Sequence, residues 1–395
     1  VILQRHQGVL RTAYGLLVGH PALVKLVLER GNSFSVRGYF KRMQETFGGH
    51  YLGMDVEPKE LVQDGVADGY PAAIGEQGYR ESAELPNELI YGISFDDSYQ
   101  QALTFTRAFF ARRLTDMEKK LQAAEQGHPL SPQYNSFSVE DLSREVVGQI
   151  AEARFGFPKG MTSQAELPET ENKARCPVDF HRVSQHVFGA SPSPTVRELA
   201  KQRGAVIQEV ARGQGRACTF GQQLAAAGYK GDFDSALVGA INGFAVSTSK
   251  TFVSVMYQWL ESGQFWSLQR EVQREPAHAR PSPSLRQLLQ TQLAEGMITL
   301  PVPDLLYRVT VEATQVAEFP GFSPRVGETV VLSLSTAARA ANSLDYLFGG
   351  AGEGWKATHA CPGREMAQGV LLGMTVGLLE RPSLMRIRDL DLTLR

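Results

Sequence analysis

Cys361 stands in a setting that favours a reactive thiolate. The segment from His359 to Ala367 reads His-Ala-Cys-Pro-Gly-Arg-Glu-Met-Ala, and an apolar helical pattern follows it. Pro362 is a residue type favoured in a first helical turn. Cys361 is therefore expected just ahead of a helix N-terminus, where the dipole and free N–H groups stabilise a thiolate. Gly363 allows the backbone to approach a flat ring closely. The pattern predicts a metal-binding thiolate, and the alternative is a helix-capping Cys-Pro-Gly turn that binds nothing.

The other two cysteines lack such a setting. Cys176 lies in Ala-Arg-Cys-Pro-Val and Cys218 in Arg-Ala-Cys-Thr-Phe, and both are interpreted as ordinary loop or packing residues. Three cysteines in 395 residues are a sparse, odd number that argues against a disulfide framework. This usage fits a reducing compartment, so we expect a cytoplasmic protein.

The composition limits the class of protein. The chain is 43% hydrophobic, and its 40 basic residues nearly balance 42 acidic ones. Because no long basic run is present, we expect no nucleic-acid partner. Apolar stretches such as Gly369 to Leu379 are shorter than the ~20 residues that span a bilayer, so we expect no membrane association. There is no signal-peptide pattern at the start. The sequence begins at Val1 rather than Met, and we expect the natural N-terminus to be missing.

The elements that must position Cys361 are mainly helical by their apolar periodicity. Helices are expected at 20–30, 98–121, 139–155, 195–212, 219–227, 234–260, 284–296 and 366–379, strands before residue 20 and at 306–312, 329–335 and 385–394, and long loops at 48–78 and 159–178. This pattern predicts a mainly α fold with minor β content near the two ends of the chain. Length alone favours two or three domains, but helices around a cofactor would make residues 1–395 a single domain.

The segment 234–260 is the longest expected helix, about 40 Å at roughly 1.5 Å per residue. Small residues recur along it: Gly239, Ala240, Gly243, Ala245 and Ser247. They indicate close approach either to a flat group or to another helix.

The cysteine segment resembles the cysteine-loop signature of the cytochromes P-450. That signature has a glycine-rich bulge, a basic residue two before the cysteine, glycine two after it and alanine six after it. His359, Gly363 and Ala367 stand at the last three of these positions. The resemblance implies the P-450 fold, a large helical domain enclosing haem b with a smaller β-rich part from the chain ends. It implies Cys361 as the axial iron ligand and His359 as a partner of a haem propionate.

The bulge departs from the family pattern. The family places Phe seven before the cysteine, whereas this chain has Gly354 there and Phe348 thirteen before. An insertion in the bulge is therefore expected.

A second match lies in the segment from Pro301 to Arg308. It resembles the family strand that follows the Glu-x-x-Arg helix, and Arg308 matches its propionate-binding arginine. A guanidinium offers a carboxylate a planar, bidentate fork. The alternative for Arg308 is a surface strand residue. The Glu-x-x-Arg motif itself is incomplete, because Ile298 stands where the arginine should follow Glu295. Without that partner, Glu295 is expected to be exposed or hydrogen-bonded otherwise.

The long helix lacks the acid of the family's acid–alcohol pair. The matching stretch runs from Asn242 through Gly243, which would face the haem, to Ser247 and Thr248, with no carboxylate between them. Either hydroxyl could take the place of the family threonine in proton delivery, and helix packing is the alternative for both. An apolar substrate pocket is expected from Phe244, Val246, Val302 and the loop 48–78.

Three functions follow from the resemblance. The first is a monooxygenase that takes electrons from a ferredoxin or flavoprotein reductase and hydroxylates an apolar small molecule. The second is a peroxide-using peroxygenase, or an isomerase or dehydratase of peroxides, which the missing acid favours. The third is a catalytically inert haem-binding protein.

Overall fold

The computed structural model describes residues 8–31, 33–48, 84–126, 128–129, 135–157, 178–189, 191–276, 281–357 and 359–394. Cys176 and nearly all of the expected loops 48–78 and 159–178 lie outside these described residues, and so do the substrate contacts expected from the first loop.

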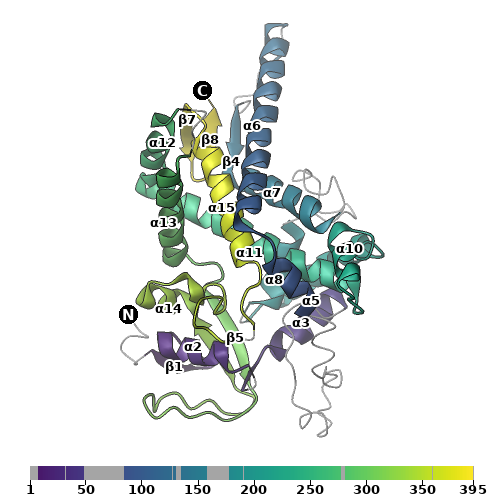
Figure 1. Ribbon diagram of the computed structural model, residues 1–395, viewed down its shortest axis with the longest axis vertical. Coiled ribbons are helices and arrows are strands. Elements are labelled where there is room, and N and C mark those ends of the chain that lie inside the picture. The colour runs from purple at the N-terminus through teal and green to yellow at the C-terminus, as the bar shows by residue number, and fades with distance from the viewer. Residues whose placement is uncertain are drawn as a thin grey trace.

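Helices dominate the described residues (Figure 1). They are α2 (Pro21–Glu29), α3 (Arg37–Phe47), α5 (Leu85–Tyr91), α6 (Phe95–Glu125), α7 (Val139–Ile150), the π-helical turn η3 (Ala151–Phe155), α8 (Val178–Val187), α9 (Pro194–Ala211), α10 (Thr219–Ala226), α11 (Phe233–Ser262), α12 (Gln264–Arg274), α13 (Pro283–Thr299), α14 (Leu334–Ala341), the 3-10 turn η5 (Leu344–Tyr346) and α15 (Arg364–Leu379). The strands are β1 (Val9–Thr12), β2 (Gly15–Val18), β3 (Phe34–Ser35), β4 (Ser136–Ser138), β5 (Leu305–Thr310), β6 (Thr329–Ser333), β7 (Leu384–Arg388) and β8 (Asp391–Leu394). The expected mainly α fold with minor β is confirmed.

The helix that follows Cys361 is fixed by its packing against α6. Gly369 and Gly373 lie one turn apart on α15, and a Cβ atom at either would come within 2.4 Å of a backbone oxygen of Phe95 or Tyr99. Only glycine permits this approach of the two backbones. From Gly369 to Leu379 every residue of α15 is buried, so the helix that follows Cys361 is anchored in the core.

A five-stranded sheet joins the two ends of the chain. Its order is β1-β2-β6-β5-β3. The early strand β2 pairs in parallel with β6, with Leu17 opposite Val331, and β5 pairs antiparallel with β6, with Tyr307 opposite Val331. Helices α2 and α14 lie beside this sheet at the lower end of Figure 1. A second sheet, in the order β4-β8-β7, lies near the other end.

Several elements differ from the sequence-based expectation. The expected strand 385–394 is the hairpin β7–β8, because the chain turns at Asp389, which has a φ of 37°. The expected strand 329–335 ends at Ser333, and α14 begins directly after it. Helices α3, α5, α8 and α12 were not expected. Of these, α5 and α8 each follow a long polar segment of the sequence. The polar residues there obscured the apolar periodicity that would have indicated the start of a helix.

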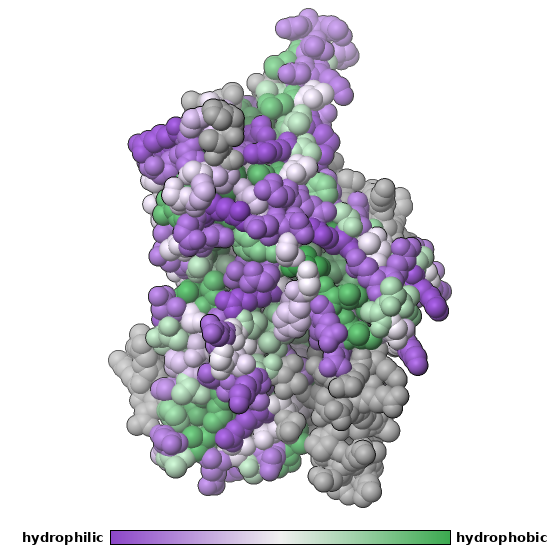
Figure 2. Space-filling view, in the orientation of Figure 1, coloured by the Kyte–Doolittle hydropathy of each residue, from purple (hydrophilic) through white to green (hydrophobic). Residues whose placement is uncertain are grey.

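The upper end of α6 projects from the body of the molecule, and Figure 2 shows mainly hydrophilic residues over that end. Among the residues that the structure describes, no helix combines the length and apolarity needed to cross a membrane.

Candidate functional site

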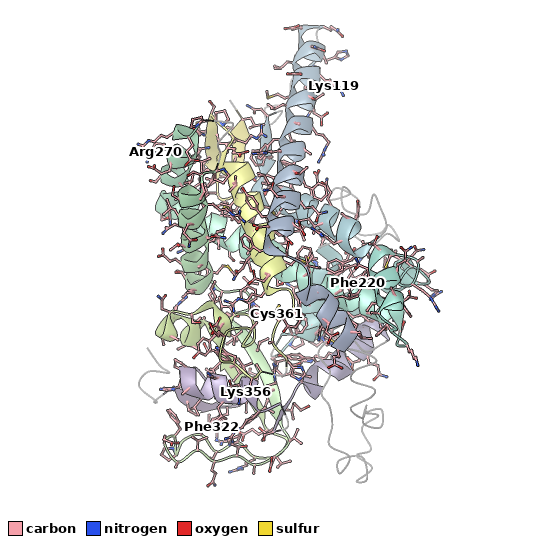
Figure 3. All side chains as sticks on the ribbon, viewed as in Figure 1. Lys119, Phe220, Arg270, Phe322, Lys356 and Cys361 are labelled. Atoms are coloured by element: carbon pink, nitrogen blue, oxygen red, sulfur yellow. The ribbon has the colours of Figure 1, made fainter. Side chains whose placement is uncertain are left out.

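Cys361 lies in the loop that leads into α15, near the middle of the molecule (Figure 3). Its side chain is half-buried and forms no disulfide. Its backbone N–H donates a hydrogen bond of 2.8 Å to the carbonyl oxygen of Phe348. This contact closes the loop directly beneath the cysteine.

The expected insertion in the bulge is accommodated outside this contact. Although Phe348 is far from Cys361 in sequence, the backbone hydrogen bond brings the two together, because Gly349 and Gly350 turn the chain with φ of 65° and 90°. The inserted residues are fastened to α2: Lys25 Nζ lies 5.0 Å from the ring centre of Trp355, and the Lys356 N–H donates to Glu29 Oε1 at 3.1 Å. Figure 3 shows Lys356 beside that helix. The two ends of the segment between Phe348 and Cys361 are thus joined by a backbone hydrogen bond.

Arg364 holds the same loop from the helix side, and sequence reasoning missed it. Its guanidinium donates to Asp345 Oδ1 at 2.7 Å and to the carbonyl of Ala351, and it lies 5.7 Å from the ring centre of Phe348. A cation in the first turn of a helix opposes the macrodipole. That unfavourable position was the available signal that Arg364 has a specific partner.

The pKa of Cys361 is not lowered, as was expected for a cysteine at a helix N-terminus, but raised. Burial raises the pKa of the Cys361 thiol, and the hydrogen bond from the Gly363 N–H and the charge of Arg364 oppose this effect without outweighing it. The helix terminus alone therefore does not hold a thiolate here. A metal cation bound to the sulfur reverses this balance, since coordination deprotonates a thiol.

Arg308 is a buried cation on β5. It is only 4% exposed, so the alternative of a surface strand residue is wrong. Its Nη1 donates to the Tyr307 carbonyl at 2.9 Å, and its guanidinium lies 5.9 Å from the ring centre of Tyr39. Within the described residues no carboxylate pairs with Arg308. A buried charge without a counter-ion is unfavourable, so this position suits an anionic group brought in by a ligand.

His359 is half-buried in the turn that precedes Cys361. Its carbonyl oxygen would lie 3.0 Å from a Cβ at position 349, so glycine there lets the two sides of the loop approach. Gly363 lies on the other side of the cysteine, and a Cβ there would be 4.0 Å from Cys361 Sγ and 3.8 Å from Ile90. There is therefore room around the sulfur on this side.

On α11, Gly243 and Ser247 act together. A Cβ at Gly243 would meet no atom within 4 Å, so open space lies beside the helix at this turn. The Ser247 hydroxyl donates to the Gly243 carbonyl at 2.6 Å. Thr248 is buried, and its hydroxyl makes no hydrogen bond with the residues that the structure describes. These two hydroxyls and the open turn are the features of α11 at the positions where the sequence predicted contact with a flat group and proton delivery.

The structure does not bring all of the expected pocket residues together. Phe244 is buried, and its ring centre lies 5.9 Å from that of Phe155 in η3. Val246 lies on a different face of α11, where it lines a groove with Ser249 and Lys250. Residues two apart on a helix do not share a face. Val302 is half-buried in the segment between α13 and β5.

Comparison with solved structures identifies the architecture. The chain is similar to P450BioI in complex with hexadec-9Z-enoic acid ligated acyl carrier protein, with a TM-score of 0.61 and 12% identity over 100% of this chain and 97% of that one. It is also similar to a mutant of P450 EryK in complex with erythromycin B, with a TM-score of 0.58 and 15% identity over 100% of this chain and 94% of that one.

The chain has the cytochrome P450 fold.

A third similar structure is substrate-free CYP109E1 from Bacillus megaterium, with a TM-score of 0.58 and 15% identity over 99% of this chain and 96% of that one. No protein-family model matches the sequence, and no curated protein matches it significantly. The P450 fold therefore rests on structural similarity along the whole chain rather than on sequence identity.

In this chain the residues around the incomplete Glu-x-x-Arg motif make other hydrogen bonds. Glu295 is exposed and accepts a hydrogen bond of 3.0 Å from Gln292, as expected for a carboxylate without its arginine. Arg339 of α14 donates instead to the carbonyl oxygens of Ile298 and Thr299 at the end of α13. A guanidinium suits the negative end of a helix. Arg339 therefore caps the carboxyl end of α13 and links it to α14.

The groove beside Val246 lies between α7, α8 and α11 and contains His181. Burial lowers the pKa of His181 to about 4, and the charges of Lys250, Arg182 and Arg144 lower it further. The imidazole is consequently neutral in the folded protein at pH values where the unfolded chain binds a proton.

This difference predicts that His181 makes the folded protein less stable in acid. Because the folded-state pKa is below the unfolded value of about 6.5, stability is fully present above that value and falls as the pH drops towards 4. We expect His181→Gln to remove ~1–2 kcal/mol of this loss, allowing for solvent screening. Urea unfolding of both proteins at pH 7 and pH 5, in buffer without phosphate, measures it. Identical losses of stability in the two proteins would contradict the prediction.

Proposed function

We propose that this protein is a haem-thiolate enzyme of the P450 type, formed by residues 1–395 as one domain, with Cys361 as the axial ligand of haem b. The observation that carries the proposal is the position of Cys361. In a chain with the P450 fold, the only half-buried cysteine among the described residues lies at the amino end of α15, in a loop closed onto Phe348. Arg308, which is buried and pairs with no carboxylate in the part of the chain that the structure describes, supports it independently.

The residues present fit such a group. Cys361 would bind the iron, with the Gly363 N–H tuning the sulfur. Arg308 and His359 would bind the propionates, and for Arg308 this would supply the missing counter-ion. The open turn at Gly243 leaves room for a flat ring against α11. When bound, haem supplies the oxidising chemistry that none of these side chains has.

The reaction that we propose is monooxygenation of an apolar small molecule. Ser247 and Thr248 would hold and pass protons: the Ser247 hydroxyl bonds the carbonyl of Gly243 at the open turn of α11, and the buried Thr248 hydroxyl makes no hydrogen bond with the described residues. Phe244 and Val302 would contact the substrate. An apolar substrate agrees with similar P450 structures that hold erythromycin B or a hexadec-9Z-enoic acid carried by a protein. Electrons would come from a ferredoxin or a flavoprotein reductase.

One observation favours a second candidate, a peroxide-using peroxygenase, isomerase or dehydratase. The residue before Ser247 is Val246, and it lines the outer groove rather than supplying a carboxylate. A peroxide already carries the oxygen atoms and reducing equivalents, so it needs less proton delivery from the protein.

The experiment is the visible spectrum of the reduced, carbon-monoxide-treated protein, followed by turnover assays. We expect a strongly red-shifted Soret band. Turnover with dioxygen and a surrogate electron donor would support the monooxygenase, and turnover with peroxide alone would support the second candidate. If the protein binds haem and neither oxidant gives turnover, it is a catalytically inert haem-binding protein. If the folded protein binds no haem, the proposal is wrong.

Replacing Arg308 is expected to affect the stability of the apoprotein and the retention of haem in opposite directions. Arg308→Leu removes a buried cation that has no carboxylate partner among the described residues, so the apoprotein should be as stable as wild type or more stable in urea. The same change should weaken haem retention by about tenfold to a hundredfold, because a charged hydrogen-bonded pair contributes about 1.5–3 kcal/mol. The rate of haem transfer to a scavenger protein measures the second effect. Unchanged retention would show that Arg308 does not contact the propionates.

A further inference from the structure

A groove between α13 and α15 is a candidate binding site outside the proposed haem site. The two helices run side by side (Figure 1), and the groove between them has a volume of about 390 Å³. Phe95, at the start of α6, and Leu344, in η5, contribute to it from two other elements. This volume lies within the range of ~300–1,000 Å³ that is usual for small-molecule sites. None of the residues assigned to the proposed haem or to the substrate lines it.

The floor of this groove is apolar. Leu293 and Met297 of α13 line it, and so do Leu371 and Leu372 of α15. None of these four side chains is more than 6% exposed, so each is already part of the core of the molecule. The floor is therefore preformed, as it is in most small-molecule sites, and it can bury the apolar part of a ligand.

Three glutamine side chains line the groove above this floor. Gln287 and Gln290 come from one face of α13, and Gln368 comes from α15. In the part of the chain that the structure describes, none of their side-chain amides makes a hydrogen bond. By contrast, Gln292 of the same helix α13 is bonded to Gln264. A glutamine amide carries both donors and an acceptor, so the three amides can bind polar groups of either kind.

The groove is also uncharged. None of the described residues that line it is acidic or basic. The guanidinium of Arg286, at the start of α13, lies 4.6 Å from the ring centre of Tyr99 and pairs with Asp96. Its charge is therefore already matched outside the groove. A charged ligand would lose its water in the groove without gaining a counter-ion, which is unfavourable.

We propose that this groove binds an uncharged small molecule that has an apolar body and carbonyl, amide or hydroxyl groups at its edge. The leucine and methionine floor buries the body, and the amides of Gln287, Gln290 and Gln368 bind the polar groups. A pure hydrocarbon fits less well, because it would remove water from the three amides without replacing their hydrogen bonds. The groove shares no residue with the proposed haem site, so its test does not depend on the proposed function.

The test is fluorescence titration of the whole chain with prodan, an uncharged naphthyl ketone whose emission shifts to the blue in apolar surroundings. We expect saturable binding at this site. The double variant Gln290→Leu/Gln368→Leu nearly keeps the size of both side chains and removes their amides, so it should weaken binding by about fivefold or more. Both glutamines are half-buried, so the variant should unfold at a temperature close to that of wild type. Unchanged or stronger binding by this variant overturns the proposal, because the groove would then recognise apolar surface alone.

A second pair of variants assigns the signal to the groove. Ala294→Phe fills the groove from α13 and should weaken prodan binding by roughly tenfold or more. Leu288→Phe is the matched control, since Leu288 lies on the same helix, is exposed and does not line the groove, and it should bind as wild type. Wild-type protein that does not bind prodan overturns the proposal, and so does binding that Ala294→Phe leaves unchanged.

Competition tests the charge of the ligand. Acetylnaphthalene, an uncharged ketone, should displace prodan from the wild-type protein, whereas naphthalenesulfonate, an anion with the same ring system, should not. If both compounds displace prodan equally well, the groove does not select an uncharged ligand and the proposal is wrong.

Discussion

Replacing Cys361 with alanine is expected to abolish the strongly red-shifted Soret band of the reduced, carbon-monoxide-treated protein. The band depends on a thiolate bound to iron, and Cys361 is the cysteine that the P450 fold places at the start of α15. Turnover should fall below detection with either oxidant, because no other described residue at this position can replace the sulfur. Absorption spectra of wild type and variant, at equal protein concentration, measure the loss.

Cys218→Ala is the matched control for this experiment. Cys218 is a second cysteine at a helix N-terminus, and it is buried: its Sγ accepts a hydrogen bond from the Gly221 N–H at 3.3 Å and donates to the Gly215 carbonyl at 3.0 Å. Its loss should cost about 1 kcal/mol as a missing helix cap and leave the spectrum unchanged. A red-shifted band that survives Cys361→Ala and disappears in Cys218→Ala would identify Cys218, before α10, as the iron ligand and would contradict the prediction.

The second large effect concerns stability. Arg203 of α9 binds Asp179 of α8 through two hydrogen bonds, Nε to Oδ1 at 2.9 Å and Nη2 to Oδ2 at 2.8 Å. The Asp179 side chain is fully buried and that of Arg203 is 7% exposed. Arg203→Leu leaves a buried carboxylate without its cation, so we expect the free energy of unfolding to fall by about 3–5 kcal/mol. Urea denaturation followed by circular dichroism measures it.

Two further variants distinguish a lost ion pair from a lost side chain. The double variant Arg203→Leu/Asp179→Leu removes both charges and should recover more than half of the lost stability. Arg212→Leu breaks the exposed pair with Glu209, in which both side chains are about 70% exposed, and should change stability by less than ~0.5 kcal/mol. If Arg203→Leu has as small an effect as Arg212→Leu, the buried pair does not link α8 to α9 energetically.

The parts of the fold that could be predicted from sequence are those with long, regular apolar patterns. The expected helix 234–260 lies within α11, and the expected helix 195–212 agrees with α9 to within one residue at each end. The short helix α5 has seven residues, too few for periodicity to stand out. The β7–β8 hairpin was missed because its turn uses Asp389 where glycine is the usual signal.

The sequence predicted candidate residues around Cys361, on the strand with Arg308 and on the long helix, but it did not predict what surrounds them in space. The order of residues around Cys361 indicated both its position before a helix and the insertion after Phe348. The burial of Arg308 without a carboxylate could not be read from a strand pattern, because it depends on helices elsewhere in the chain. The groove around Lys250 has the same origin: its three helices are distant in sequence, and Val246 had been expected to face the substrate.

The order of strands in the main sheet sets the time at which the cysteine loop can be completed during synthesis. Strand β2, from the first residues described, pairs directly with β6, and the inserted loop before Cys361 is fastened to α2. Strand β2 must therefore wait until β6, more than 300 residues later in the chain, has left the ribosome before it gains this partner. A cofactor that needs Cys361 and Arg308 together can therefore be bound only after both of these residues and the sheet that joins β2 to β6 are in place.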